Sequence, residues 1–162
     1  MNSMSPTGPL ILCYDGSEHA KHAIEQAAEL FPGKHTLVLT IWQPVSNLGG
    51  FGWPSMTAGI NLAELNRDAA EQAGRIAQEG VEMARQFGLE AEQLAVEATG
   101  SIAGAVVKTA DEYRAGIVIL GSRGLTGVRS MLLGSVSSAV VHHAHQPTLV
   151  VHLPEASELA AA

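Results

Sequence analysis

Ile117-Val118-Ile119-Leu120, followed at once by Gly121, is the stretch of this sequence that decides the fold. It is a short apolar run without the alternation of apolar and polar residues that a half-exposed strand shows. Continuous runs of this kind are typical of parallel strands that are buried on both faces. The stretch therefore predicts a buried strand that leads directly into a glycine-rich segment.

Runs of the same character recur along the chain. They span 10–14, 37–42 and 148–151, and a weaker strand pattern covers 91–97. Between them, apolar residues recur at helical spacing over 20–31, 65–87, 102–113 and 136–143. Strands that alternate with helices pair in parallel through right-handed crossovers. The sequence therefore predicts one doubly wound α/β domain over 10–153, with flexible ends at 1–9 and 154–162.

Local signals mark the ends of these helices. Ser17 and Ser101 stand where the first and third helices begin, and serine is a favoured N-cap. Gly88 follows the long second helix, and Pro147 follows the last one. Glycine after a helix and proline beyond it are common stop signals.

Composition and net charge limit the classes of ligand and partner that fit this chain. The chain has 162 residues, of which 46% are hydrophobic and 15% charged, and this is a globular composition. The net charge of −7 disfavours nucleic acid as a partner, because an acidic surface repels a phosphate backbone. A single mononucleotide stays possible, because local dipoles and a metal ion can hold it.

The location expected from the sequence is the cytoplasm. Cys13 is the only cysteine, so no intrachain disulfide can form, and its place in an apolar run predicts an inert thiol. The first nine residues lack the basic start of a signal peptide. No apolar run approaches the ~18 residues that a membrane helix needs.

The segment after 117–120 carries the strongest functional signal. Gly121 and Gly124 let the backbone approach a ligand closely, because glycine has no Cβ. Gly134 opens the last helix, where free N–H groups and the helix dipole attract phosphate. The spacing is neither that of a P-loop nor that of a dinucleotide fingerprint. We expect the hydroxyls of nearby serines to add hydrogen bonds, namely those of Ser122, Ser135 and Ser137.

Two other strand ends could contribute to the same site, because ligands of open α/β sheets bind beyond the carboxyl ends of strands. Asp15-Gly16-Ser17 follows the first strand. It is either a tight turn that leads into a helix cap, or it places a carboxylate near a ribose or a metal. Ile41 and Trp42 end the second strand, where a backbone group could pair with an adenine edge.

A loop, a pair of histidines and a possible catalytic triad each have more than one interpretation. The Gly- and Pro-rich loop over 43–60 is either functional, a flap on the next helix, or a partner surface. His142 and His145 have a spacing that metal ligands use on a helix, but imidazoles near a helix C-terminus are the favoured interpretation. A Ser/His/Asp triad receives little support, because the chain has no G-x-S-x-G elbow.

The motif Gly121-x2-Gly124-x9-Gly134-Ser135 resembles the ATP-binding motif of universal stress proteins, G-x2-G-x9-G-[S/T]. The stretch 120–151 is similar to the family signature throughout. Asp15-Gly16-Ser17 after the first strand also resembles the family's opening. The resemblance covers 10–151, and the C-terminal motif is the specific part of it.

The resemblance implies a five-stranded parallel sheet in the order 3-2-1-4-5, with helices on both faces. It also implies ATP, often with Mg²⁺ on the phosphates, and a homodimer through the last strand, Thr148 to Val151. The ATP-binding positions that it implies are Asp15, Ile41, Leu120, Gly121, Ser122, Arg123, Gly124, Gly134, Ser135, Val136 and Ser137. It names no metal ligand from the protein.

The sequence therefore predicts an ATP-binding stress-response or regulatory protein with an unidentified protein partner. Efficient catalysis is not expected, because Asp15 is the sole evident general base, and Arg123 and Arg129 are the only cations within the loop. At most slow ATP hydrolysis is predicted. The alternatives are a weak ATPase or phosphotransferase, and a dimeric interaction module that works without nucleotide.

Overall fold

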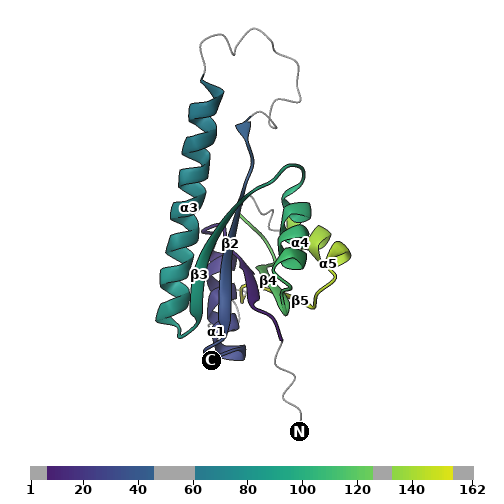
Figure 1. The fold of residues 1–162 in the computed structure, drawn as a ribbon. Coiled ribbons are helices and arrows are strands. Elements are labelled where there is room, and N and C mark those ends of the chain that lie inside the picture. Colours follow the sequence, from purple (N-terminus) through teal and green to yellow (C-terminus); the bar gives the residue numbers. More distant parts are fainter. Residues whose placement is uncertain (1–6, 46–60, 126–132, 155–162) are drawn as a thin grey trace.

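The computed structural model describes residues 7–45, 61–125 and 133–154. Strands and helices alternate along the chain (Figure 1). The elements are β1 (Leu10–Cys13), α1 (Glu18–Leu30), β2 (His35–Trp42), α3 (Leu62–Gln86), β3 (Glu90–Glu97), α4 (Ile102–Glu112), β4 (Ile117–Gly121), α5 (Ser135–His143) and β5 (Thr148–Val151). Every strand and helix that the sequence predicts is present, with bounds that differ by a few residues.

The strands form one parallel sheet in the order β3-β2-β1-β4-β5, which confirms the predicted topology. β1 lies at the centre, where Leu12 is paired with Val38 of β2 and with Ile119 of β4. Because the chain goes from β1 outward to β2 and β3, and then returns to β4 beside β1, the strand order reverses between β1 and β4. This is the switch point at which ligands of such sheets bind.

Two helical layers cover the sheet, one on each face. One hydrophobic core packs α1 and α3 against it and contains the side chains of Leu10, Leu12 and Ile24. The other packs α4 and α5 against the opposite face and contains Ile11 and Val118. Neighbouring residues of β1 point to opposite faces, as the pleat of a strand requires. Strands buried on both faces explain why their sequences are continuously apolar.

Side chains begin three of the helices. The Ser17 hydroxyl accepts a hydrogen bond from the Ala20 N–H at the start of α1, and Ser101 does the same for Gly104 in α4. Asn61 caps α3, which therefore begins three residues earlier than its apolar pattern predicts. Gly88 ends α3 with a φ of 91°, a conformation that favours glycine.

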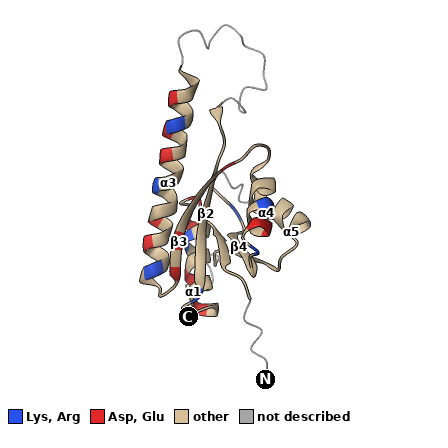
Figure 2. Cartoon of the chain, in the orientation of Figure 1, with Lys and Arg blue, Asp and Glu red and all other residues tan. Residues whose placement is uncertain are grey.

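Acidic and basic residues occur along the whole length of α3 (Figure 2). In the described ranges, no helix combines the length and the apolar character required to cross a membrane. Most of the predicted flexible ends, and 46–60 of the loop over 43–60, lie outside the described residues.

Candidate functional site

A pocket with a cavity volume of about 460 Å³ opens at the carboxyl ends of β1, β2 and β4, on the face that α4 and α5 cover. This volume is typical of small-molecule sites. Every site residue predicted from the sequence lines this pocket except Ser122. The lining also contains residues that the sequence did not single out. Together they are Cys13, Tyr14, Asp15, Ala20, Leu39, Ile41, Ile102, Val106, Leu120, Gly121, Arg123, Gly124, Leu125, Gly134, Ser135, Val136 and Ser137.

Ser122 lies behind the pocket instead of in it. Its side chain is fully buried, and its hydroxyl lies 3.2 Å from Nδ1 of His19 in α1. Its backbone N–H donates to the Val151 carbonyl, and its own carbonyl accepts from the Gly134 N–H at 2.7 Å and the Ser137 hydroxyl at 2.9 Å. Ser122 therefore fixes the start of α5 relative to β4 and β5, and its hydroxyl does not face the cavity.

The three motif glycines have different surroundings. A Cβ on Gly121 would lie 2.7 Å from His19 Cβ and 2.8 Å from the His19 carbonyl carbon, so glycine is needed here to let α1 approach β4. A Cβ on Gly124 would lie 2.7 Å from Oδ2 of Asp15. A Cβ on Gly134 would meet its nearest atom, the Ser122 carbonyl oxygen, at 3.4 Å, an ordinary contact. Within the described protein, Gly134 alone of the three has room for a side chain.

Asp15 joins the first strand to the glycine-rich segment. Its Oδ1 accepts the Ser17 N–H at 3.0 Å, and its Oδ2 accepts the Leu125 N–H at 3.3 Å. The carboxylate therefore shapes the turn into α1, as the first interpretation predicts. It also lines the pocket, and its contact with a ribose or a metal stays a prediction. The hydrogen bond to Leu125 holds the backbone after Gly124 at the pocket mouth.

The first turn of α5 faces the pocket with its N–H groups uncapped. Gly134 is its N-cap residue and offers no side-chain hydrogen bond, unlike the caps of α1, α3 and α4. The first N–H groups of a helix have no partner within it. The Ser137 hydroxyl is buried and donates to the Ser122 and Gly134 carbonyls, whereas that of Ser135 lies on the pocket wall. Amide N–H groups and the Ser135 hydroxyl are therefore the donors offered here.

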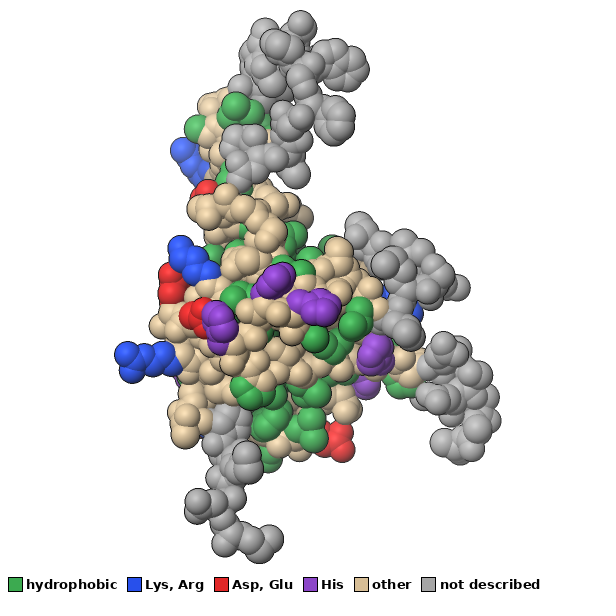
Figure 3. Space-filling view, turned by 90° about the vertical axis from the view of Figure 1, so that its right-hand side faces the viewer, with side chains coloured by type: hydrophobic (Ala, Val, Ile, Leu, Met, Phe, Trp, Pro, Cys, Tyr) green, Lys and Arg blue, Asp and Glu red, His purple; other side chains and the backbone are tan. Residues whose placement is uncertain are grey.

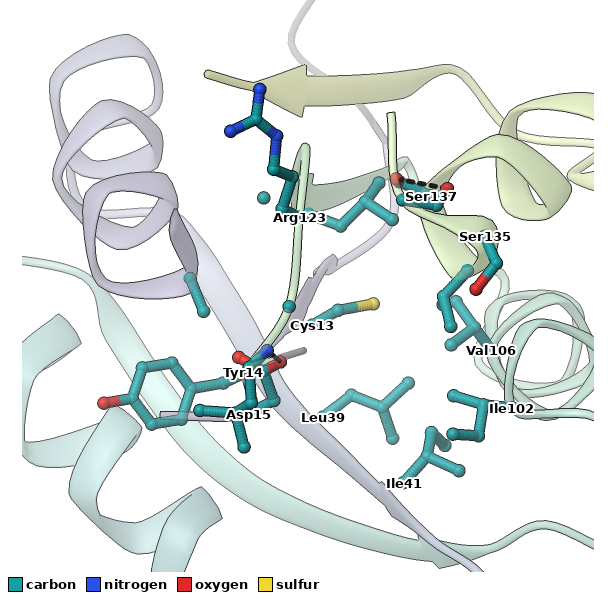
Figure 4. Close-up of a pocket in the computed structure, with 17 residues that line it drawn as sticks. Cys13, Tyr14, Asp15, Leu39, Ile41, Ile102, Val106, Arg123, Ser135 and Ser137 are labelled. Carbon is teal, nitrogen blue, oxygen red and sulfur yellow. Dashed lines mark hydrogen bonds between the residues drawn. The ribbon is translucent and has the colours of Figure 1, made fainter. Parts of the chain in front are cut away.

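An apolar wall forms the opposite side of the pocket (Figure 4). Leu39 and Ile41 come from β2, and Ile102 and Val106 from α4. Of these four residues, the sequence predicts only Ile41 as part of the site. The others follow from spacing, because Leu39 is two residues from Ile41 on the same strand face, and Ile102 and Val106 are one helical turn apart. Such a wall fits the flat, apolar faces of a planar ring.

Two ionisable groups beside the pocket stay neutral. Burial, followed by the charge of Asp15, raises the pKa of the Cys13 thiol to about 12, so the sulfur stays protonated and unreactive. The Tyr14 ring points away from the cavity, and its hydroxyl donates to Glu79 of α3 at 2.7 Å. Burial and this hydrogen bond raise the Tyr14 pKa further above its usual range. Neither group supplies acid–base chemistry.

Within the ranges that the structure describes, no group of three or more His, Cys, Asp or Glu side chains could hold a metal ion. His142 lies in the last turn of α5, where a helix dipole favours imidazole. His145 lies beyond the helix and contacts Asp111 at 3.1 Å. The histidines at the end of α5 therefore have local electrostatic partners.

Comparison with known sequences gives a consistent result. The model of the universal stress protein family matches residues 7–152. Universal stress protein MJ0531 of Methanocaldococcus jannaschii is 29% identical over 150 residues, which are 90% of this chain and 82% of that protein. A universal stress protein of Thermus aquaticus is 31% identical over 144 residues, covering 88% of this chain and 96% of its own.

Solved structures share the fold. The hypothetical protein MJ0577 matches with a TM-score of 0.74 at 21% identity, covering 94% of this chain and 100% of its own. A universal stress protein in complex with cAMP matches with a TM-score of 0.63 at 24% identity, covering 93% of this chain and 100% of its own. A universal stress protein from Archaeoglobus fulgidus in complex with dAMP matches with a TM-score of 0.58 at 18% identity, covering 91% of this chain and 99% of its own. At these identities the likeness establishes the architecture alone.

Proposed function

The chain belongs to the universal stress protein family, and on this basis we propose that it is a regulatory ATP-binding protein with at most slow hydrolysis. One observation carries the proposal: the uncapped first turn of α5, the glycines Gly121, Gly124 and Gly134, and the apolar wall all face one pocket at the switch point of the sheet. Donors for phosphate and an apolar slot for a base are the two things that a nucleotide needs.

The residues of the pocket divide into two groups along its length. Leu39, Ile41 and the α4 residues would enclose the base, while Asp15 at the end of β1 would face the ribose. The N–H groups of Ser135, Val136 and Ser137 would bind the phosphates, and Gly124 and Gly134 would leave room for them. Mg²⁺ would bind to the phosphates and offset their charge.

The named complexes of related structures support an adenine nucleotide. Solved universal stress proteins contain cAMP and dAMP, and both ligands carry an adenine and a phosphate. ATP is our choice among such ligands because of the G-x2-G-x9-G-[S/T] spacing over 121–135. Slow turnover is expected because Asp15 is the only carboxylate that lines the pocket in the described chain, and both its oxygens accept amide hydrogen bonds.

We further propose that two copies pair through β5. It is an edge strand of the sheet, with the apolar sequence Thr148-Leu-Val-Val151. The opposite edge, β3, carries Glu90, Glu92 and Glu97, and charged side chains on an edge strand oppose pairing with another chain. The two edges are therefore unequal, and only β5 is suited to extend the sheet.

A glycine-to-alanine pair tests the nucleotide site. We expect Gly134→Ala to stay folded with at most a small loss of stability, since its Cβ would have ordinary protein contacts and only the N-cap preference for glycine is lost. We expect it to weaken ATP binding at least tenfold, because the methyl group would enter the phosphate space. Gly74→Ala on α3, where a Cβ meets nothing within 4 Å, is the matched control. Isothermal titration calorimetry with ATP and Mg²⁺ measures the affinity, and extraction of the purified protein measures bound nucleotide.

The same measurements distinguish the alternative function. A purified protein that contains no nucleotide and gives no heat with ATP and Mg²⁺ would overturn the proposal. It would favour the nucleotide-independent interaction module, whose remaining feature would be pairing through β5. Equal ATP affinity in Gly134→Ala and wild type would leave nucleotide binding intact but place the phosphates elsewhere in the pocket.

A further inference from the structure

His19 lies directly behind the glycine-rich segment. It is the second residue of α1, and Gly121 of β4 packs against its backbone and Cβ. Its Nδ1 lies 3.2 Å from the Ser122 hydroxyl. Ser122 in turn holds the Gly134 N–H and the Ser137 hydroxyl at the start of α5. The imidazole is therefore one hydrogen bond away from the residue that positions the proposed phosphate donors.

Charged and titratable groups face this imidazole from each neighbouring segment. They are Asp15 after β1, His22 on α1, Arg123 after β4 and His152 after β5. Two of them, Asp15 and Arg123, line the pocket. Histidine side chains gather on one surface of the molecule (Figure 3), and the Arg123 guanidinium points away from the apolar wall of the pocket (Figure 4). His19 thus shares its electrostatic surroundings with the pocket.

In the free protein this environment opposes a charge on His19. Burial lowers the His19 pKa first, and the charges of Arg123 and His152 lower it further below its usual value. The hydrogen bond to Ser122 does not oppose protonation, because a hydroxyl oxygen can accept from a protonated ring nitrogen. Asp15 acts in the opposite direction. An anion in the pocket would offset the part of the opposition that the neighbouring cations contribute, whereas the effect of burial would remain.

We propose that His19 is a positioning residue that takes up a proton when a phosphate-bearing nucleotide enters the pocket, so that nucleotide affinity rises as the pH falls. This inference rests on the proposed function. Phosphates bound in the pocket, which Arg123 also lines, would bring negative charge closer to the imidazole and stabilise its cation. By linkage, a ligand that favours the protonated state binds more tightly to it.

The direction of the His19 pKa change determines the pH range over which nucleotide affinity changes. Well above neutral pH, His19 is uncharged with or without nucleotide and adds nothing to affinity. As the pH falls through the pKa of the complex, which the bound phosphates raise, binding takes up a proton and becomes tighter. The gain stops increasing below the lower pKa of the free protein. Each pKa unit between the two states corresponds to at most a tenfold change in affinity.

Calorimetric titration of the full chain with ATP and Mg²⁺ between about pH 8 and about pH 6 tests this linkage. His19→Asn retains a side-chain amide that can pair with Ser122 but cannot titrate. We expect wild-type affinity to rise over this range by roughly threefold or more relative to His19→Asn. Protonation of ATP itself is common to both proteins and cancels. His35→Asn, at the start of β2 and at the other end of the strands from the pocket, is the control and should keep the wild-type profile.

A second measurement does not depend on a variant. Proton NMR of the histidine rings in wild-type protein should show the His19 pKa rising when ATP and Mg²⁺ are added. His35, at the start of β2 beside Glu92, should not move, because the pocket is at the other end of the strands. Parallel pH profiles for wild type and His19→Asn, or an unmoved His19 resonance in a saturated sample, would overturn the linkage alone. No ATP binding at any pH would overturn the proposed function and the linkage together.

Discussion

Gly121 and Gly134 belong to one motif but are glycines for different physical reasons. At Gly121 the neighbour is protein, since a Cβ would lie within 2.7–2.9 Å of His19 backbone and Cβ atoms. At Gly134 the φ of −70° suits any residue, and a Cβ would have ordinary contacts. A requirement for glycine at Gly134 would therefore come from the ligand and not from the fold.

This difference makes a stability prediction for single residues. We expect Gly121→Ala to lower the free energy of unfolding by about 1–3 kcal/mol, because the methyl group must push α1 away from β4. Urea unfolding followed by circular dichroism measures it. Gly134→Ala should cost less, at most about 1 kcal/mol, because it makes no clash and loses only the preference of an N-cap for glycine over alanine. Equal stability losses in the two variants would contradict the packing described for Gly121.

The direction of the Ser122 side chain could not be predicted from the sequence. Its hydroxyl was expected in the pocket with those of Ser135 and Ser137. Position along a loop does not determine side-chain direction, and the structure turns Ser122 toward α1. The hydrogen bond between Asp15 and the Leu125 N–H likewise joins residues far apart in the chain, and no local pattern reports it.

At the scale of elements, prediction succeeds because the signals are local. Each signal depends on residues within one turn or one strand: the apolar runs, the serine caps and Gly88. Together these signals predict all five strands and four helices of the described chain. The sequence places the start of α3 three residues too late, because Leu62 and Ala63 after the Asn61 cap are exposed and do not belong to the buried face of the helix. The strand order came from the family resemblance, since pairing between distant strands leaves no local trace.

The packing of α3 on the sheet gives a prediction at the same scale. Gly80 faces Tyr14 and Val38, and a Cβ there would lie 2.8 Å from each side chain. We expect Gly80→Ala to destabilise the protein by about 1–3 kcal/mol, since both neighbours are buried and cannot move freely. Gly74→Ala, in the same helix but in open space, should stabilise by up to about 1 kcal/mol through helix propensity. Thermal unfolding compares the two variants, and a stabilised Gly80→Ala would contradict the close packing.

For the whole molecule, the two edges of the sheet determine how copies could assemble. The carbonyl of Pro147, just before β5, accepts the Val118 N–H, and the carbonyl of Val151 accepts the N–H of Ser122, just after β4. Alternation along a parallel strand then turns the N–H of Val150 to the open edge. That N–H is free to pair with a second copy without disturbing the sheet.

Val150→Pro tests the assembly, because proline removes this N–H while an apolar side chain is kept. We expect wild type to sediment as a dimer and the variant to sediment as a monomer. Circular dichroism of the variant is the control for an intact fold. A monomeric wild type, or a folded variant that still dimerises, would exclude pairing through this edge of β5.

The uncapped start of α5 has a consequence for the life of the protein in a cell. A ligand that supplies the hydrogen-bond acceptors missing there becomes part of the folded state, and each bound molecule is withdrawn from the population able to unfold. Proteases degrade chains that have opened. Under the proposed function, the protein would therefore be cleared faster when nucleotide is scarce and accumulate when it is plentiful. Its abundance alone would then report the energy supply of the cell.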